Sequence, residues 1–235
     1  MIQRDFTQLE KRLNLKFSNL DRINQAFIHK SYVNEYKTGE LANNERLEFL
    51  GDAVLELVST KHLFTQYPHH NEGDMTAYRS ALVKGKHLAQ VARELGIGEY
   101  LFLSRGEERS GGREKSYILA NTMEALIGAV YLDEGYEAAE KMIQTFILTQ
   151  LDNIISEGLH IDAKSHLQEL SQERENFTPY YELIKQEGPD HDKIFTMGVY
   201  IKDNLIAQGK GSSKQKAENS AAENALEKLQ WNNKQ

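Results

Sequence analysis

The stretch from residue 43 to residue 59 reads Asn43-Asn-Glu-Arg-Leu-Glu-Phe-Leu-Gly-Asp-Ala-Val-Leu-Glu-Leu-Val-Ser59. At about 100° per residue it predicts a helix that is apolar over more than half of its circumference. Such a helix is expected to be buried, and buried carboxylates are costly unless they are paired, protonated or bound to a metal. Four carboxylates nevertheless share one narrow stripe of this helix: Glu45, Glu48, Asp52 and Glu56. The stripe is therefore either a solvated acidic face or a cation site.

The whole chain has the composition of a globular protein, with 235 residues, of which 40% are hydrophobic and 27% charged. No apolar run is long enough to span a membrane, and the first residues enter a charged amphipathic pattern at once. We therefore expect neither a membrane span nor a signal peptide. The lack of cysteine excludes disulfides, thiolate zinc sites and cysteine nucleophiles, and it fits a cytoplasmic location. The net charge of −7 argues mildly against a polyanion partner unless basic residues cluster.

The first half of the chain predicts helices joined by short connections, with no strand before residue 155. The helix with the acidic stripe should end near Gln66, because Pro68 follows it. Asp74 is expected to cap a helix that reaches Leu95, after which two glycines follow. The segment 105–115 is polar and glycine-rich, so it predicts a loop. The remaining predicted helices are centred on Phe6–Leu13 and Ile23–Ile28 and cover 116–132 and 136–155.

The second half has a different pattern. We interpret residues 156–161 as a linker between a domain over 1–155 and a domain over 162–235. The latter predicts a helix, three strands and a final helix with alanines on its inner side. These elements are expected over 163–175, 179–187, 195–201, 205–208 and 213–229. The expected fold is therefore multidomain, with an all-α domain followed by a small α+β (α-β-β-β-α) domain.

The predicted helix 116–132 carries a second polar pair. Asn121 and Glu124 are three residues apart, so they share one helix face, and Glu124 is the only charged residue between Lys115 and Asp133. Such a carboxylate either pairs structurally or has a function. Together with the acidic stripe, it suggests a joint site of oxygen ligands, which Mg²⁺ or Mn²⁺ prefer. A site of this kind suits two-metal hydrolysis of phosphodiesters, provided that the two helices meet.

At this point the residues resemble a known family. Asn44-Glu-Arg-Leu-Glu-Phe-Leu-Gly-Asp52-Ala-Val-Leu is similar to the signature of the ribonuclease III family. Three flanking pieces resemble it too: Phe27-Ile-His-Lys-Ser-Tyr32, Ser110-Gly-Gly-Arg113 and Ile118-Leu-Ala-Asn-Thr-Met-Glu-Ala-Leu. The likeness covers essentially the whole chain. It implies a double-strand-specific endoribonuclease of rRNA and mRNA processing and decay, with a helical, dimeric catalytic domain.

The resemblance also implies roles for single residues. Glu48 and Glu124 would bridge the metal ions, Asp52 and position 121 would complete the metal shell, and Glu45 would support it. The implied cofactor is Mg²⁺, for which Mn²⁺ can substitute, and no organic cofactor is expected. Family members are homodimers in which each protomer cuts one strand, leaving a 5′ phosphate and a short 3′ overhang. Phe49 resembles the residue that inserts into the partner protomer.

Position 121 departs from the family pattern, which usually has aspartate there. Asparagine keeps the shape and one carbonyl ligand but removes a negative charge from the site. We therefore expect lower metal affinity. Three explanations stay open at the level of sequence: natural drift with retained activity, a substitution made to trap substrate, or a chain that binds without cutting.

The second domain resembles a double-stranded-RNA-binding domain. Its most specific piece is Gly209-Lys-Gly-Ser-Ser-Lys-Gln-Lys-Ala217, where lysines stand at a helix start that favours phosphate. A Gly-x-Gly pattern alone is more typical of a structural turn. The resemblance implies contacts to the minor groove of the RNA from the helix 163–175 and from the turn 188–192. The alternative for this turn is that it is merely exposed to solvent. The candidate RNA-binding residues are Gln168, Glu169, His191, Lys210, Lys214 and Lys216.

Other functions stay open beside the nuclease. A double-stranded-RNA binder that does not cleave is motivated by Asn121. A helical scaffold without an RNA partner would require that Lys214→Glu leave duplex binding unchanged. The segment 69–74 has metal-ligand residue types, but it precedes a helix start and is interpreted as a surface loop. Glu56 lies one turn beyond Asp52 and is interpreted as a residue at the rim of the site.

Overall fold

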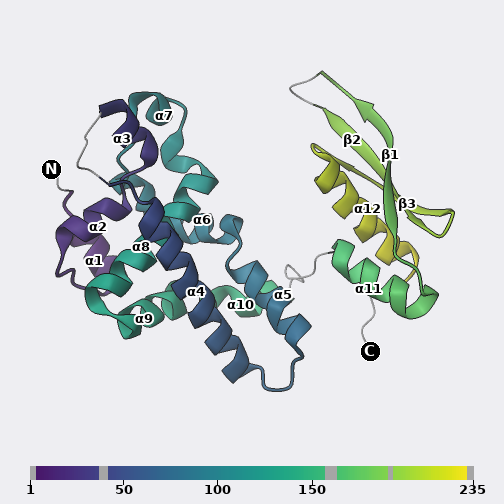
Figure 1. Ribbon diagram of the computed structural model, residues 1–235, viewed down its shortest axis with the longest axis horizontal. Coiled ribbons are helices and arrows are strands. Elements are labelled where there is room, and N and C mark those ends of the chain that lie inside the picture. The colour runs from purple at the N-terminus through teal and green to yellow at the C-terminus, as the bar shows by residue number, and fades with distance from the viewer. Residues whose placement is uncertain (1–3, 37–41, 157–162, 190–192, 232–235) are drawn as a thin grey trace. The chain divides into compact units, whose positions relative to one another are not determined.

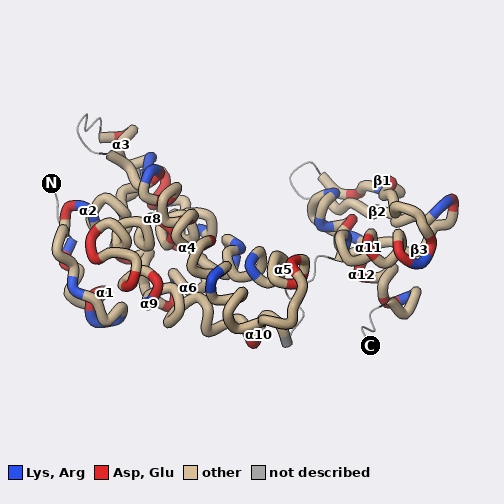
Figure 2. Tube along the Cα trace, turned by 60° about the horizontal axis from the view of Figure 1, so that its bottom comes forward, with Lys and Arg blue, Asp and Glu red and all other residues tan. Residues whose placement is uncertain are grey.

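The computed structural model describes residues 4–36, 42–156, 163–189 and 193–231. The chain divides into two compact units, Met1–His160 and Ile161–Gln235, which we treat separately (Figure 1). None of the helices in the described ranges is long and apolar enough to cross a membrane. The predicted linker at 156–161 falls outside the described residues except for Ser156, which ends a helix. Acidic and basic residues are interspersed in both units, so the negative net charge is not gathered in one block (Figure 2).

The first unit is helical, as its sequence predicts. Its short connections include three-residue and four-residue 3₁₀ turns and an isolated bridge between Ile28 and Phe102. The helices are α1 (Thr7–Leu13), α2 (Leu20–Ala26), α3 (Lys30–Tyr36), α4 (Glu45–Gln66), α5 (Glu72–Leu82), α6 (Gly85–Glu94), α7 (Arg105–Arg109), α8 (Ser116–Glu134), α9 (Tyr136–Phe146) and α10 (Leu151–Ser156).

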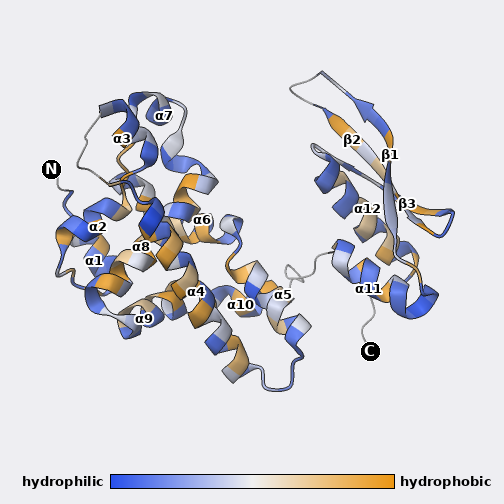
Figure 3. Ribbon diagram, in the orientation of Figure 1, coloured by the Kyte–Doolittle hydropathy of each residue, from blue (hydrophilic) through white to orange (hydrophobic). Residues whose placement is uncertain are grey.

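Helices α4 and α8 pack against each other within the core of this unit (Figure 3). Between Ile118 and Val130 every residue of α8 is buried except Asn121 and Glu124. Each buried aliphatic side chain contributes about 1.5–3 kcal/mol through removal of apolar surface from water. The core therefore holds α8 in a fixed rotation about its axis, and that rotation leaves only Asn121 and Glu124 of this segment partly exposed.

The two helices cross at a pair of glycines, Gly51 of α4 and Gly128 of α8. A Cβ atom on Gly51 would overlap the backbone carbonyl oxygen of Glu124, and one on Gly128 would overlap that of Leu47. Glycine costs helix propensity of roughly 0.5–1 kcal/mol relative to alanine, so its presence in two helix interiors requires a packing reason. The reason here is the close approach of two backbones, which the sequence alone did not reveal.

Several predicted boundaries were wrong in the first unit. The helix expected from Asp74 to Leu95 is two helices, α5 and α6, and the side chain of Asn71 caps α5 by accepting from the backbone N–H of Asp74. The expected loop 105–115 contains α7, whose N-cap is Ser104. The expected helix 136–155 is interrupted between α9 and α10. The Ser104 cap starts α7 and the 3₁₀ turn Leu148–Gln150 separates α9 from α10, whereas no side-chain cap marks the start of α6.

The second unit is the expected helix–strand–strand–strand–helix module. It consists of α11 (Ala163–Glu175), β1 (Tyr180–Glu187), β2 (Ile194–Ile201), β3 (Asn204–Gly211) and α12 (Lys214–Lys228). The strands form one antiparallel sheet in the order β1-β2-β3. Both helices cover one face of it, where the alternating residues Val199 and Ile201 are buried (Figure 1). The alanines of α12 lie in this core, as predicted: Ala217, Ala221, Ala222 and Ala225.

The glycines before α12 have a packing role. Gly209 and Gly211 lie in β3, which extends further than predicted, and they point toward α12. A Cβ on Gly209 would overlap the backbone N–H of Ala221, and one on Gly211 would come within 2.5 Å of the backbone nitrogen of Ala217. Small residues on both elements thus let the helix lie close on the strand. The Gly-x-Gly pattern therefore serves this contact.

Candidate catalytic site and RNA-binding surface

The polar residues of α4 and α8 meet. Nδ2 of Asn121 donates a hydrogen bond of 2.9 Å to Oε1 of Glu48, although the two residues are 73 positions apart in the chain. The contact lies next to the glycine crossing, where the backbones of α4 and α8 touch. The sequence predicts that the acidic stripe shares one face of α4 and that Asn121 and Glu124 share one face of α8. The structure brings these two faces together.

Glu124 is half-buried on the same side of α8 and has an unusual protonation equilibrium. Burial, and then the negative charges of Asp52 and Glu48, raise its pKa to about 7. Burial also raises the pKa of Glu48, against the opposing effect of the hydrogen bond from Asn121. Three carboxylates therefore repel one another at this place, and the charge of Lys30 offsets the effect at Glu48 only in part. Such a negative field is typical of functional sites that take up a positive charge.

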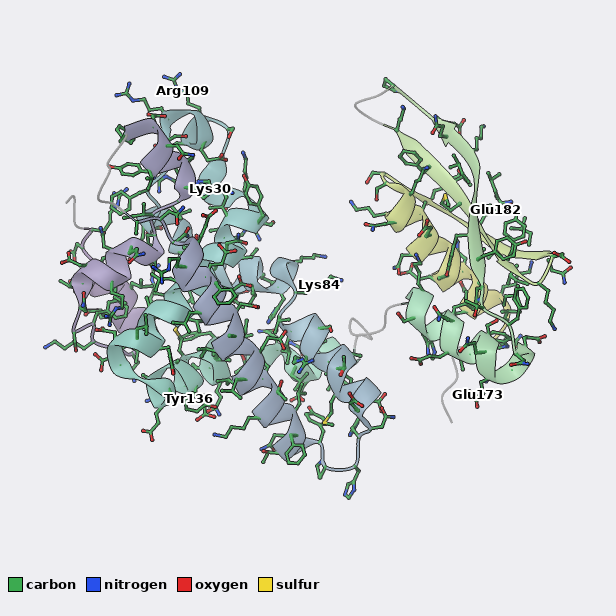
Figure 4. All side chains as sticks on the ribbon, viewed as in Figure 1. Lys30, Lys84, Arg109, Tyr136, Glu173 and Glu182 are labelled. Atoms are coloured by element: carbon green, nitrogen blue, oxygen red, sulfur yellow. The ribbon has the colours of Figure 1, made fainter. Side chains whose placement is uncertain are left out.

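The two ends of the acidic stripe differ from its middle. Glu45 accepts a hydrogen bond of 2.9 Å from Nδ2 of Asn43, which lowers its pKa, and lies 3.4 Å from the ammonium of Lys30 (labelled in Figure 4). Glu56 pairs with Arg79 of α5 at 3.0 Å. In the described part of the chain, neither Glu48 nor Asp52 has an ion pair. The middle of the stripe is thus the part left available for a ligand.

The donor set suits a hard divalent cation by its chemistry, since it offers carboxylate and carboxamide oxygens and no sulfur. Within the described ranges, however, no three His, Asp or Glu side chains stand close enough together to hold a metal. Asn121 presents its amide nitrogen to Glu48, and its oxygen would have to turn inward to act as a ligand. Cation binding therefore requires these side chains to turn toward one another.

Two family models match the chain. Residues 21–151 match the family model described as Ribonuclease-III-like, and residues 163–229 match the double-stranded RNA binding motif. Ribonuclease 3 of Dehalococcoides mccartyi is 43% identical over 226 residues, which are 96% of this chain and 95% of the relative. The chain belongs to the ribonuclease III family.

Further relatives support the membership. Ribonuclease 3 of Borreliella burgdorferi is 43% identical over 227 residues, covering 95% of this chain and 92% of the relative. The nuclease domain of ribonuclease III from Campylobacter jejuni is similar in structure, with a TM-score of 0.57 and 39% identity over 62% of this chain and 97% of that one. The chain is accordingly a double-stranded-RNA endoribonuclease with a helical nuclease unit and a double-stranded-RNA-binding unit.

The RNA-binding candidates of the second unit lie on three elements. Lys214 and Lys216 are exposed in the first turn of α12, which Ser213 caps by accepting from the backbone N–H of Lys216. Lys210 is exposed on β3. Free N–H groups at such a helix start, together with lysine ammonium groups, favour phosphate oxygens.

The first helix of the RNA-binding unit carries the remaining candidates. Gln168 and Glu169 are exposed on α11, and Gln168 lines an open hollow of about 270 Å³ together with Lys164 and Tyr181. Lys164 lies over the ring of Tyr181 at 4.8 Å and pairs with Glu218 at 2.6 Å. Sequence reasoning missed Lys164, although its spacing of four from Gln168 could have indicated it. His191 lies outside the described residues.

Proposed function

We propose that the chain hydrolyses the phosphodiester bonds of duplex RNA with two Mg²⁺ ions, which Mn²⁺ can replace, held by Glu48, Asp52, Asn121 and Glu124. The bound ions would supply an activated water and stabilise the charge that develops on the phosphoryl group. The hydrogen bond between Asn121 and Glu48 is the observation that supports this most, because it joins the polar faces of two separate helices.

The chain's own residues have distinct parts in this proposal. Glu124, whose pKa is raised to about 7, would hold the ions as a carboxylate, and their positive charge would favour its deprotonated form. Asp52 is exposed and open to substrate, whereas Glu45, held by Lys30, supports the start of α4. The expected products are 5′ phosphates with short 3′ overhangs, formed during rRNA and mRNA processing and decay in the cytoplasm. We assign the nuclease domain to 1–155, the linker to 156–161 and the RNA-binding domain to 162–235.

A cleavage assay tests the proposal directly. A long, perfectly paired RNA is incubated with the protein and Mg²⁺, with and without a chelator, and the termini of the products are mapped. Short duplexes with 5′ phosphates should appear only with the metal. If the protein binds the duplex but no metal-dependent products form, the non-cleaving binder suggested by Asn121 takes the place of the nuclease.

Asn121→Asp should lower the Mg²⁺ concentration that supports half-maximal cleavage by on the order of 10-fold, the range measured for groups that tune a metal shell. The physical reason is the restored negative charge beside Glu48. The measurement is a Mg²⁺ titration of the initial cleavage rate. Asn19→Asp is the matched control, because Asn19 is an exposed N-cap of α2 whose role aspartate can fill. An unchanged titration curve for Asn121→Asp would show that position 121 is no ligand.

Replacing Lys214 and Lys216 with glutamine should weaken duplex binding and reduce its salt dependence. Each lysine that neutralises a phosphate contributes about one to the slope of log K against log salt concentration. The magnitude of that slope should therefore be smaller by about two in the double variant than in wild type. Fluorescence anisotropy of a labelled duplex measures the binding constant at each salt concentration. Lys228→Gln, at the opposite end of α12, is the control and should leave the slope unchanged. If wild type, the double variant and Lys228→Gln have equal slopes, Lys214 and Lys216 do not contact RNA phosphates.

We also propose that the protein is a homodimer and that one face of α4 forms the contact. Phe49, Leu57 and Phe64 are 80%, 58% and 73% exposed. At about 100° per residue they lie within about 80° of one another around the helix. The name of the Campylobacter jejuni structure refers to a region involved in dimer formation of that nuclease domain. Three exposed large apolar residues on one ridge suit burial against a second copy.

Phe49→Glu should convert the dimer to a monomer at micromolar concentration. A buried aromatic anchor commonly contributes about 2 kcal/mol or more, so its replacement by a charge should raise the dimer dissociation constant by roughly 30-fold or more. Light scattering coupled to size exclusion measures the mass. Leu20→Glu, an exposed apolar residue in the first turn of α2, should leave the mass unchanged. A Phe49→Glu protein with the wild-type mass would place the dimer contact elsewhere.

A further inference from the structure

The sheet of the second unit has a face that the helices do not cover. Met197 and Val199 are buried toward α11 and α12, so the residues between and beside them point the other way. On that side lie Gly198 and Tyr200 of β2, with Leu205 of β3 paired to Tyr200. Among the described residues, no helix packs on this side (Figure 3).

The side chains on this uncovered face form one connected apolar patch. An atom placed at the Cβ position of Gly198 would lie 2.8 Å from Cδ1 of Ile184, 2.9 Å from Cδ1 of Leu205 and 3.0 Å from the ring of Tyr200. These three side chains therefore gather over the glycine. The ring of Tyr180 stacks on that of Tyr200, with centroids 5.2 Å apart and an interplanar angle of 11°. We call Tyr180, Ile184, Tyr200 and Leu205 the outer patch.

The outer patch is exposed although its members touch. Tyr180 is 39% exposed, Ile184 43% and Leu205 41%. Exposed apolar surface is unfavourable in water, and contiguous patches of it are typical of interaction sites. The hydrophobic core of this unit lies on the opposite face, between the sheet and the two helices. The outer patch is therefore extra apolar surface, whose removal from water requires a partner.

The charges around the outer patch define the kind of partner. Glu182 pairs with Gly198 across the sheet and so points to the outer side, and Asp203 lies in the turn between β2 and β3, two residues before Leu205. Burial, and then the charges of Glu182 and Asp203, raise the pKa of Tyr180. In the described part of the chain neither carboxylate has an ion pair. The nearby lysines are already paired, Lys185 with Glu187 at 2.7 Å and Lys202 with Glu175 at 2.8 Å.

This negative rim excludes several occupants. A nucleic acid or an anionic membrane would be repelled, and a second copy meeting face to face would bring like charges together. Lys210 also points to the outer side, but it lies at the other end of β3 from Leu205. Lys214 and Lys216 belong to α12 on the covered face, so a partner on the outer patch leaves them free for RNA.

We propose that the outer patch is a docking site for a protein segment that carries large apolar side chains flanked by lysine or arginine. The apolar side chains would cover Ile184 and Leu205 and stack beside the tyrosine pair, and the flanking cations would face Glu182 and Asp203. Docking of this kind would bring a partner protein to the nuclease while duplex RNA is bound.

A peptide selection tests the proposal on the full-length protein. Random 12-residue peptides displayed on phage are selected on the wild-type chain and counter-selected on an Ile184→Lys/Leu205→Lys variant. The recovered peptides should combine large apolar residues with lysine or arginine. As synthetic peptides they should bind wild type in fluorescence anisotropy and bind the double variant at least 10-fold more weakly. Glu182→Gln/Asp203→Asn should weaken them less and reduce their salt dependence.

Controls make the outcome decisive. The Ile184→Lys/Leu205→Lys variant must keep duplex RNA binding and its melting temperature, and Lys214→Gln must leave peptide binding unchanged. The proposal is overturned if no peptide is recovered, if the recovered peptides are acidic, or if duplex RNA displaces them. It is also overturned if the Ile184→Lys/Leu205→Lys variant has a different mass from wild type in light scattering, because the patch would then bind a second copy of the chain.

Discussion

Glu124→Gln should abolish metal-dependent cleavage of duplex RNA and leave duplex binding intact. The substitution keeps the shape of the side chain and removes the charge on which the proposed site most depends. Losing one preorganised electrostatic group commonly costs about 10²–10³ in rate, and the loss of a carboxylate that would hold the ions should lie at or above the upper end. The measurement is the single-turnover rate at saturating enzyme, with anisotropy of the same duplex for binding.

The matched control is Glu56→Gln. Glu56 belongs to the same acidic stripe on α4 but pairs with Arg79, so its loss should change the cleavage rate little. If Glu124→Gln cleaves as fast as wild type, or if both variants lose activity equally, the proposed division of the acidic residues is wrong.

The same variant has a second expected effect, on stability. In the folded protein without metal, the pKa of Glu124 is raised from 4.5 to about 7. The folded state then binds more protons than the unfolded state between these two values, so its free energy of unfolding falls as pH rises through that window. Glutamine is neutral at every pH and avoids this loss. Metal-free Glu124→Gln should therefore melt higher than wild type at pH 8, and the difference should shrink below pH 4.5.

The long helices could be predicted from the sequence because several independent features agree. In α4 a broad apolar surface ends at Gln66, shortly before Pro68, and in α8 an apolar run ends at Gly135. Between α5 and α6 the features conflict. The amphipathic pattern continues through Val83 and Lys84, yet the chain leaves the helix there. A break that depends on tertiary packing leaves no clear local mark.

The candidate site likewise has features that local sequence spacing predicts and features that depend on tertiary contacts. Helix spacing predicts that Asn121 shares a face with Glu124, since that property is local. The contact between Asn121 and Glu48 is not local: the residue types suggested a joint site, but the sequence did not show that the two helices meet. The glycines of the crossing were missed for a related reason. A glycine in a helix shows that something lies close, but the sequence does not say that Gly51 faces the backbone of Glu124.

Gly51→Ala should destabilise the nuclease unit by at least about 3 kcal/mol, the upper part of the range for overpacked cores. Its added methyl group would overlap the backbone carbonyl oxygen of Glu124, which cannot move aside as a flexible side chain would. Chemical denaturation measures the loss. Gly106→Ala is the control, because Gly106 is exposed in α7. The new methyl group would lie 4.0 Å from Oγ of Ser104, which is an ordinary contact distance. This variant should match wild type or gain up to about 1 kcal/mol.

The effect of Gly51→Ala on activity should exceed its effect on folding. Where the variant is still fully folded, at low temperature, α8 must shift away from α4 to accommodate the methyl group. Glu124 and Asn121 move with α8, whereas Glu48 and Asp52 stay with α4. Because catalytic groups lose much of their effect when displaced by about 1 Å, cleavage should fall by roughly 10²-fold under conditions where circular dichroism is unchanged. A folded Gly51→Ala protein with normal cleavage would mean that the crossing does not position the site.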